Sequence, residues 1–130
     1  MRTIKFRAQD FTGSWNYGFI AKGNESAIIL PLRNDGAVFM GINIYVKPET
    51  IGEFTSLQDK NGRDIYEGDI LKCGDEKDLL EVRFVRGVFA FLWNGNLDDE
   101  FPTGSPTHEW AEVVGNIHDN PEMIKRKQVL

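Results

Sequence analysis

The sequence of 130 residues fits one domain, and its 41% apolar residues can form a hydrophobic core without disulfides. The formal charge of −5 is unevenly spread: residues 1–50 carry a balance of +2, residues 51–100 of −6 and residues 101–130 of −1, so we expect no general binding to duplex DNA. No apolar run approaches the roughly 20 residues that cross a bilayer, and residues 1–10 lack the apolar stretch of a signal peptide, which predicts a cytoplasmic protein with no membrane partner.

The N-terminus is predicted to form a β-hairpin. Residues 3–9 alternate between apolar and polar side chains, and this period of two is typical of a strand. Residues 15–21 form a second run, and Thr12 and Gly13 between the two runs favour a turn. We therefore expect these two strands to pair.

The next segments indicate further strands and a division of the chain. Residues 26–32 are apolar, but the run is short and Pro31 disfavours a helix there. Residues 37–46 are apolar and β-branched, which predicts a strand, and residues 51–57 predict a short one. The connector at residues 47–52 separates the two parts of the chain. We expect a single domain over residues 1–130 with three subregions: an N-terminal β region (1–50), a second β region (51–120) and a tail (121–130).

The most detailed structural prediction is a hairpin over residues 79–93. Two alternating runs flank Arg86 and Gly87, and a two-residue turn at that point pairs Phe84 with Phe89. This register places large apolar residues together on one face, so we expect both phenylalanines to be buried against the core. The predicted pairs are Val85 with Val88, Phe84 with Phe89, Val82 with Phe91, and Leu80 with Trp93.

The C-terminal part of the chain predicts a loop, a strand and a short helix. Residues 94–109 are polar and interrupted by Gly and Pro, which is typical of a long surface loop. Residues 110–117 predict the final strand. Asn120 and Pro121 suit the cap and first position of a helix. The elements together predict a mainly β domain with little helix.

Three sequence blocks, which together span nearly the whole chain, carry a resemblance to a known family. Their sequences are IKFRAQD at residues 4–10, FTSLQDKNGRDIYEGDI at residues 54–70 and EVVGNIHDNPE at residues 112–122. In this order and spacing they resemble the YopX family of proteins, which occur in bacteriophages and in prophage regions of bacteria. The chain departs from the usual pattern of the family at two positions, where Gln9 replaces Trp and Ser56 replaces Gly.

The resemblance implies a fold and an origin, but no reaction. It implies a mainly β fold (α+β with little helix), in which a small SH3-like or barrel-like C-terminal part follows the N-terminal β-hairpin region. It also implies a phage or prophage protein, which would work in the cytoplasm of the bacterial host. Structural roles account for parts of the blocks, because Asn61 and Gly62 suit a tight turn and Gly68 suits a bend at a barrel corner.

The residues that carry common chemistry do not form a recognisable site in the sequence. Cys73 is the only cysteine, and His108 and His118 are ten residues apart with no cysteine near either of them. The sequence holds no phosphate-binding glycine loop, dinucleotide fingerprint or nucleophile motif. We therefore expect no enzyme, no catalytic residue, no metal site and no cofactor; an enzyme would need a deep pocket in which an acid and a base converge.

The leading functional hypothesis is a non-enzymatic accessory protein. It would bind a host or phage protein, or assemble with itself as a homo-oligomer, because small barrels commonly present loops or strand edges to partners. The predicted binding residues are Trp15, Tyr17 and Phe19 on the N-terminal hairpin. The alternative for these rings is that they pack across the two halves of one monomer.

The second functional hypothesis is a nucleic-acid-binding accessory protein that uses a basic and aromatic N-terminal face. Trp15 and Tyr17 could stack on bases, which every single-stranded nucleic acid offers. The cations that could contact phosphates lie in the less acidic part of the chain: Lys5, Arg7, Lys22 and Arg33. The overall charge argues against this hypothesis.

Overall fold

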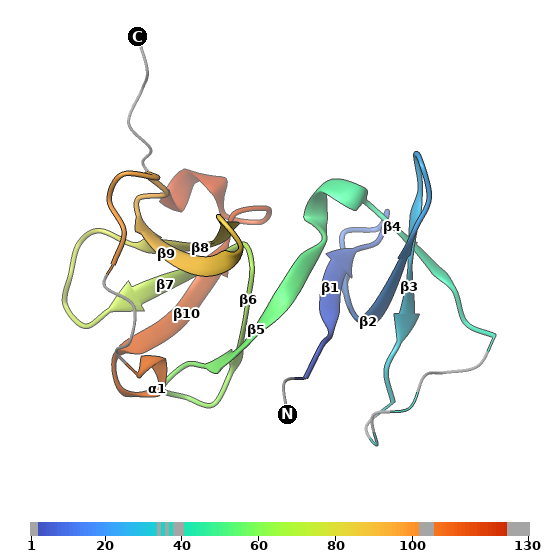
Figure 1. Cartoon of the computed structure of the whole chain (residues 1–130), viewed down its shortest axis with the longest axis horizontal. Helices are drawn as coiled ribbons and strands as arrows, with labels where there is room; N and C mark the ends of the chain where they lie inside the picture. Colours follow the sequence, from blue (N-terminus) through green and yellow to red (C-terminus); the bar gives the residue numbers. More distant parts are fainter. Residues whose placement is uncertain (1–2, 34, 36, 38–40, 102–105, 125–130) are drawn as a thin grey trace, which may run out of the picture. The chain divides into compact units, whose positions relative to one another are not determined.

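The computed structural model describes residues 3–33, 35, 37, 41–101 and 106–124. The chain divides into two compact units, Met1–Phe54 and Thr55–Leu130, which we call the first and second unit. Figure 1 shows the first unit in blue through cyan to green and the second unit in green through yellow to red. The division lies two residues after the end of the predicted connector at residues 47–52.

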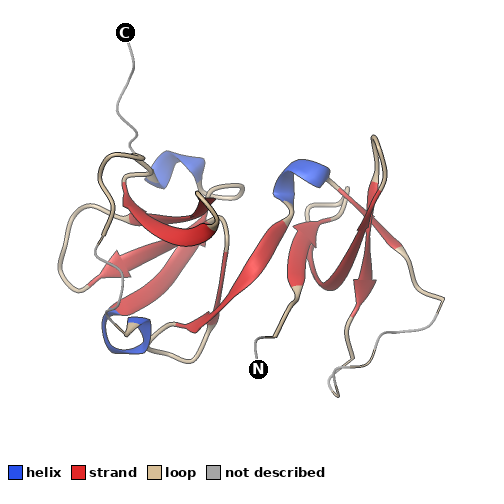
Figure 2. Ribbon diagram, in the orientation of Figure 1, coloured by secondary structure: helices blue, strands red, loops and turns tan. Residues whose placement is uncertain are grey.

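The structure is mainly β, as predicted, and Figure 2 shows strands throughout both units with only short helical segments. The described residues hold three such segments: η1 (Pro48–Thr50), α1 (Thr107–Trp110) and η2 (Pro121–Met123). The strands are β1 (Phe6–Gln9), β2 (Trp15–Lys22), β3 (Ala27–Pro31), β4 (Ile44–Val46), β5 (Gly52–Gln58), β6 (Asp64–Tyr66), β7 (Asp69–Cys73), β8 (Leu80–Val85), β9 (Val88–Trp93) and β10 (Ala111–Asn116).

The N-terminal hairpin is confirmed as β1 and β2. Phe6 lies opposite Gly18, and Gln9 lies opposite Trp15. The turn between the strands is organised by the carboxylate of Asp10, which accepts hydrogen bonds from the side chain and backbone of Thr12, from the Ser14 N–H and from the side-chain amide of Asn16 in β2. Because these bonds favour the charged form, led by those from the side chains of Thr12 and Asn16, the pKa of Asp10 is lowered from 3.8 to about 2.

The remaining strands of the first unit extend the sheet from β2 to β4, and the end of β4 contacts the end of β1. The apolar run left unassigned in the sequence is strand β3, which pairs with β2 and β4. The strand predicted over residues 37–46 is β4 only at its end, and residues 38–40 lie outside the described residues. Val46 forms a bridge with Asp10, and the Lys47 N–H donates to the Gln9 carbonyl at 2.8 Å. The end of β4 thus joins the end of β1.

One face of this sheet forms the core of the first unit. Its buried members are small or β-branched: Ala8, Ala27, Ile29 and Val46, with Ile20, Ile44 and Ile51 packed against them. Within β1, Ala8 points into this core. Successive side chains of a strand point to opposite faces of the sheet, so residues of the other parity, at odd-numbered positions in β1, lie on the opposite face.

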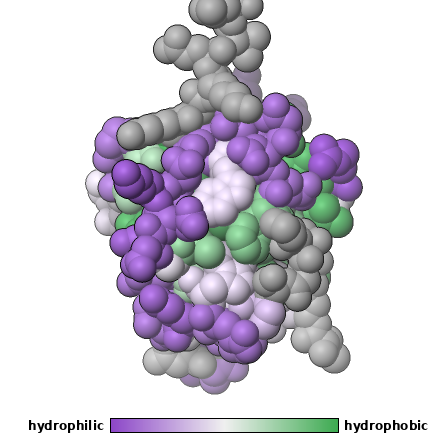
Figure 3. Space-filling model, turned by 90° about the vertical axis from the view of Figure 1, so that its left-hand side faces the viewer, coloured by the Kyte–Doolittle hydropathy of each residue, from purple (hydrophilic) through white to green (hydrophobic). Residues whose placement is uncertain are grey.

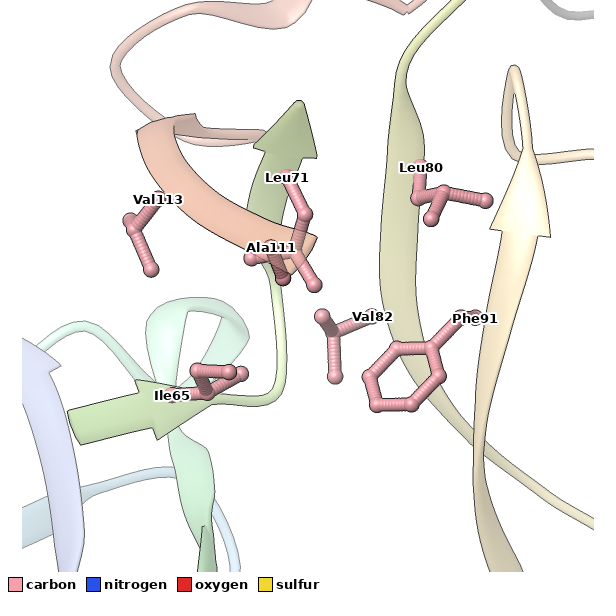
Figure 4. Close-up of a cluster of buried hydrophobic side chains, with 7 residues drawn as sticks. All are labelled: Ile65, Leu71, Leu80, Val82, Phe91, Ala111 and Val113. Carbon is pink, nitrogen blue, oxygen red and sulfur yellow. The ribbon is translucent and has the colours of Figure 1, made fainter. Parts of the chain in front are cut away.

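The second unit contains a four-stranded antiparallel sheet in the order β10-β7-β8-β9. The predicted hairpin at residues 79–93 is confirmed with its register, since Phe84 lies opposite Phe89 and Leu80 opposite Trp93. Figure 4 shows side chains from several strands converging on one core. The core residues are Ile65, Leu71, Leu80, Val82, Phe91, Ala111 and Val113.

The prediction that both phenylalanines are buried against the core is wrong, because Phe89 is only half-buried and Phe84 is exposed. The side chain of Phe84 is 51% exposed, and Val88 at the tip of the same hairpin is 56% exposed. Strand β7 pairs with β8 only at Leu80 and Glu81, so the tip of the hairpin extends beyond its neighbouring strand. Phe84 and Phe89 instead contact each other edge to face, with ring centroids 5.1 Å apart.

A buried carboxylate holds the turn between β5 and β6. Asp59 accepts hydrogen bonds from the backbone N–H groups of Asn61 and Arg63 within the turn, and from that of Val113 in β10. Burial of the carboxyl group acts to raise its pKa, but these hydrogen bonds outweigh burial, so the pKa of Asp59 is lowered. The central sequence block thus contains a turn that is tied to the final strand.

Part of the segment predicted as a long loop pairs with β9. Glu100 forms a bridge with Leu92, and the Phe101 N–H donates to the Phe91 carbonyl at 2.7 Å. The predicted final strand is confirmed as β10, although Trp110 belongs to α1. The predicted helix start is only the single turn η2, and Asn120 does not cap it with its side chain. That side chain accepts a hydrogen bond from the Asn116 N–H instead.

Candidate functional site

The three predicted binding residues lie on the same strand and the same face. Trp15, Tyr17 and Phe19 alternate along β2, whereas Ile20 has the other parity and packs against the core. Tyr17 is 46% exposed and Phe19 is 39% exposed, while Trp15 is half-buried. The structure therefore brings the three predicted rings together on the side of the sheet that faces away from the core.

Neighbouring strands add three residues that the sequence analysis did not select. Phe19 lies opposite Leu30 of β3, and Ile28 of β3 lies opposite Tyr45 of β4. Tyr45 is 64% exposed, and both β3 residues are half-buried. We call this set the outer face of the first unit: Trp15, Tyr17, Phe19, Ile28, Leu30 and Tyr45. Residues 27–31 are all apolar, so the sequence held no alternation that could place Ile28 and Leu30 on this face.

The cations nearest to the outer face are stacked on aromatic rings. Arg7 lies opposite Tyr17 in the register, is only 4% exposed, and has its guanidinium carbon 4.6 Å from the centroid of the Trp15 ring. The Lys5 ammonium lies 4.6 Å from the centroid of the Phe54 ring. Such cation–π contacts stabilise a charge that is partly removed from water. Arg7 is therefore not an exposed cation on this face.

The remaining cations of the nucleic-acid hypothesis lie outside β1 to β4 or at the end of a strand. Arg33 forms an ion pair with Asp35 at 3.4 Å, and both side chains are more than half exposed. Lys22 is the exposed last residue of β2. The structure thus brings the predicted rings together, but it does not gather the four predicted cations around them as exposed groups.

The second unit presents a different kind of surface. Figure 3 shows a side of this unit on which hydrophilic residues surround a narrower, less polar strip. The exposed residues Asp98 and Asp99 adjoin Leu97, which is 55% exposed. The Trp93 N–H donates to the Asp99 carbonyl at 2.8 Å, and the Asp99 N–H donates to the Asn96 carbonyl at 3.1 Å. These bonds hold residues 97–100, which we call the acidic segment, against the end of β9.

Within the described residues, the structure shows no group of three or more His, Cys, Asp or Glu side chains placed to hold a metal ion. His108 is exposed, with Nε2 3.9 Å from a carboxylate oxygen of Glu109, and His118 is half-buried. The described segments likewise include no helix of the length and apolarity required to span a membrane. An open pocket of about 470 Å³ in the second unit is lined by Lys72, Asp75, Glu76, Lys77, Leu79, Val114 and Met123.

Comparisons with known proteins agree with the resemblance found in the sequence. The chain is similar to protein EF1440 from Enterococcus faecalis, with a TM-score of 0.56 and 23% identity over 96% of this chain and 100% of that chain. It is also similar to YopX from Bacillus subtilis, with a TM-score of 0.51 and 20% identity over 98% of this chain and 100% of that chain. At these identities the two structures show a shared fold. No curated protein matches the chain. The model of the YopX protein family matches residues 5–125, and the chain therefore belongs to the YopX family.

Proposed function

We propose that this chain is a non-enzymatic accessory protein of a bacteriophage or prophage, which acts in the host cytoplasm by binding proteins through the outer face of its first unit. The observation that carries this proposal is the exposure of Tyr17, Phe19 and Tyr45 on one side of a sheet. Large apolar side chains that gather on a surface are typical of an interaction site, because isolated ones are common and gathered ones are not.

The outer face is separate from the residues that hold the first unit together. The core uses the opposite parity of the same strands, with Ala27 and Ile29 of β3 buried while Leu30 is only partly covered. A partner could therefore cover the rings without any rearrangement of the core. Tyrosine and phenylalanine suit this role because they bury a large area while few torsion angles become fixed.

A protein partner fits this surface better than a nucleic acid does. Arg7 is buried against Trp15, and the whole chain carries a charge of −5. Binding to phosphate backbones draws most of its affinity from exposed Lys and Arg. Stacking of bases on Tyr17 and Phe19 remains the mechanism that a nucleic-acid partner would use.

The proposal is tested with an outer-face variant that combines Tyr17→Thr, Phe19→Thr and Tyr45→Thr, since threonine retains a preference for strands. The matched control combines Phe84→Thr and Val88→Thr, which removes exposed apolar side chains from the hairpin tip of the second unit. Each immobilised protein is incubated with a nuclease-treated lysate of cells in which the phage or prophage is active.

We expect the wild-type protein and the control to retain the same phage or host protein, and the outer-face variant to lose it. Retention by all three proteins would contradict the proposal. A parallel titration with fluorescent single-stranded oligonucleotides tests the alternative. Micromolar binding that the outer-face variant loses would favour nucleic acid as the partner and would also contradict the proposal.

A further inference from the structure

We propose that Asn61 is a site of spontaneous modification, at which the side-chain amide is lost and the turn between β5 and β6 is loosened. The site lies in the second unit, so the inference is independent of the outer face. Asn61 is followed by Gly62, and the sequence holds one other asparagine that precedes a glycine, Asn94 before Gly95. The two pairs differ in their surroundings, and this difference carries the inference.

An asparagine that precedes a glycine can lose its side-chain amide without an enzyme. The backbone nitrogen of the glycine gives up its proton and attacks the side-chain carbonyl carbon of the asparagine, which forms a new C–N bond. The bond from this carbon to the side-chain nitrogen breaks, and that nitrogen takes up a proton and leaves as ammonia. Water then opens the resulting succinimide ring at either carbonyl group, which gives aspartate or isoaspartate. Glycine favours the attack because it has no side chain that obstructs it.

The pair of Asn61 and Gly62 is open to solvent. Both residues are exposed, and a Cβ added to Gly62 would meet no atom of the described residues within 4 Å. The N–H of the attacking nitrogen donates to the Asp59 carbonyl at 3.0 Å, so this bond must open before the reaction. Because the turn is exposed, water can replace the partner that is lost, and the opening costs little free energy.

The pair of Asn94 and Gly95 is enclosed. Asn94 is half-buried and Gly95 is buried. The Gly95 N–H donates to the Leu92 carbonyl at 3.1 Å, and the Asn94 N–H donates to the Leu79 carbonyl at 2.8 Å. The Gly95 carbonyl also accepts a hydrogen bond from Arg83 at 3.4 Å. Attack at Asn94 therefore requires the end of β9 to separate from β8, which leaves buried groups without their partners.

Asp59 controls how often the exposed turn opens. Its carboxylate accepts hydrogen bonds from the N–H groups of Asn61 and Arg63, each at 2.9 Å, while its carbonyl accepts the one from Gly62. A reaction that takes place in a transiently opened state follows the population of that state. Loss of the Asp59 carboxylate should therefore accelerate the reaction at Asn61.

Both products alter the turn. Aspartate places a second carboxylate two residues from that of Asp59, and like charges repel. Isoaspartate lengthens the backbone by a methylene group before Gly62, which displaces the N–H that donates to Asp59. Since the Asp59 carboxylate also accepts a hydrogen bond from the Val113 N–H at 3.0 Å, either product weakens the connection between this turn and β10.

The test compares the two asparagines within the same full-length chain. Folded wild-type protein is incubated in mildly alkaline buffer, and samples are digested under mildly acidic conditions, in which the reaction is slow. Mass spectrometry measures the replacement of NH₂ by OH in the peptides that contain Asn61 and Asn94, and labelling with protein isoaspartate methyltransferase reports isoaspartate. A parallel time course in urea gives the rates of the unfolded chain. Asn61→Gln and Asn94→Gln are matched variants, because the longer side chain of glutamine closes a ring far more slowly.

We expect Asn61 to convert about tenfold faster than Asn94 in the folded protein, since a hydrogen bond lost from a buried group costs more than one that water replaces. In urea the two rates should be similar. Asn61→Gln should remove most of the isoaspartate label, whereas Asn94→Gln should leave it unchanged. Asp59→Ala should accelerate conversion at Asn61 several-fold while Asn94 stays slow, which separates local opening from global unfolding. The modified fraction, isolated by ion exchange through its additional negative charge, should melt at a lower temperature.

Equal conversion of the two asparagines in the folded protein would overturn the inference. So would an Asn61 that stays intact in the folded protein while it converts in urea. An Asp59→Ala variant that converts no faster would contradict the role of Asp59, and a modified fraction that melts like the unmodified protein would contradict the loosening of the turn.

Discussion

In the second unit, the rings of Phe91, Phe101 and Trp110 pack together at the core, with centroids 4.6 Å apart for Phe101 and Trp110. In the first unit, Tyr17 and Tyr45 face outward while alanine, isoleucine and valine fill the core. The same residue class thus stabilises one unit and is exposed on the other. This contrast indicates that aromatic content alone does not locate a core, because a ring is buried only where other elements cover the face on which it lies.

The largest effect that tests this contrast is the loss of a core ring from the second unit. We expect Phe91→Ala to lower the free energy of unfolding by about 3–5 kcal/mol, because the ring is 6% exposed and its removal leaves a cavity. Phe84→Ala, in the same hairpin, should cost about 1 kcal/mol or less because its ring is half exposed. Urea denaturation checks both values, and equal costs would show that the assignment of the two positions is wrong.

The next effect concerns the buried carboxylate that ties a turn to β10. We expect Asp59→Ala to cost about 2–3 kcal/mol, because it removes the acceptor of three backbone N–H groups, one of them in the buried residue Val113. Asp75→Ala, at an exposed turn position, should be nearly neutral. Chemical denaturation of both variants decides, and a neutral Asp59→Ala would mean that water replaces the carboxylate without cost.

A smaller effect is expected at Ser56, where the usual glycine of the family is replaced. Its φ of +69° lies in the left-handed region, which costs a side-chain-bearing residue roughly 1–2 kcal/mol. We expect Ser56→Gly to stabilise the protein by about 0.5–1 kcal/mol, after the greater flexibility of glycine in the unfolded chain is included. Ser56→Ala keeps the strain and serves as the control. A gain from alanine as large as that from glycine would exclude backbone strain as the cause.

The smallest predicted effect is a pH dependence in the first unit. The pKa of Asp10 is lowered from 3.8 to about 2, so its charge contributes stability that is fully present above pH 4 and is lost as the pH falls toward 2. Thermal melts at several pH values should therefore show that the deficit of Asp10→Asn relative to the wild type shrinks as the pH falls. Glu49→Gln is the control for the loss of one exposed carboxylate. A deficit independent of pH would contradict this assignment.

The sequence pattern predicted those parts of the fold that depend only on residues within a single hairpin. The register of β8 and β9 followed from their alternation around Arg86 and Gly87. The exposure of Phe84 did not follow, because it depends on where β7 ends beside the hairpin. Sequence alternation identifies a face of a strand, whereas burial also requires the neighbour that covers it.

The outer face was predicted only in part for a similar reason. The alternation along β2 placed Trp15, Tyr17 and Phe19 together, but Tyr45 joins them only through β3, whose short run with Pro31 had no assigned structure. The burial of Arg7 depends on its contact with Trp15 across two strands. Period-two patterns do not show whether a cation on a strand will be exposed or stacked on a neighbouring ring.

The central claim is that the rings of the outer face bind partners, including the further copies of the chain expected from the sequence, and do not hold the monomer together. Its most direct test is the mass of the wild type and the outer-face variant by light scattering over a concentration series up to about 100 µM. The account predicts a wild-type mass that rises above 14.8 kDa with concentration, and a folded variant that stays at 14.8 kDa. A wild type that remains monomeric, together with a variant that melts at a much lower temperature, would show that the rings pack within the monomer and would contradict the claim.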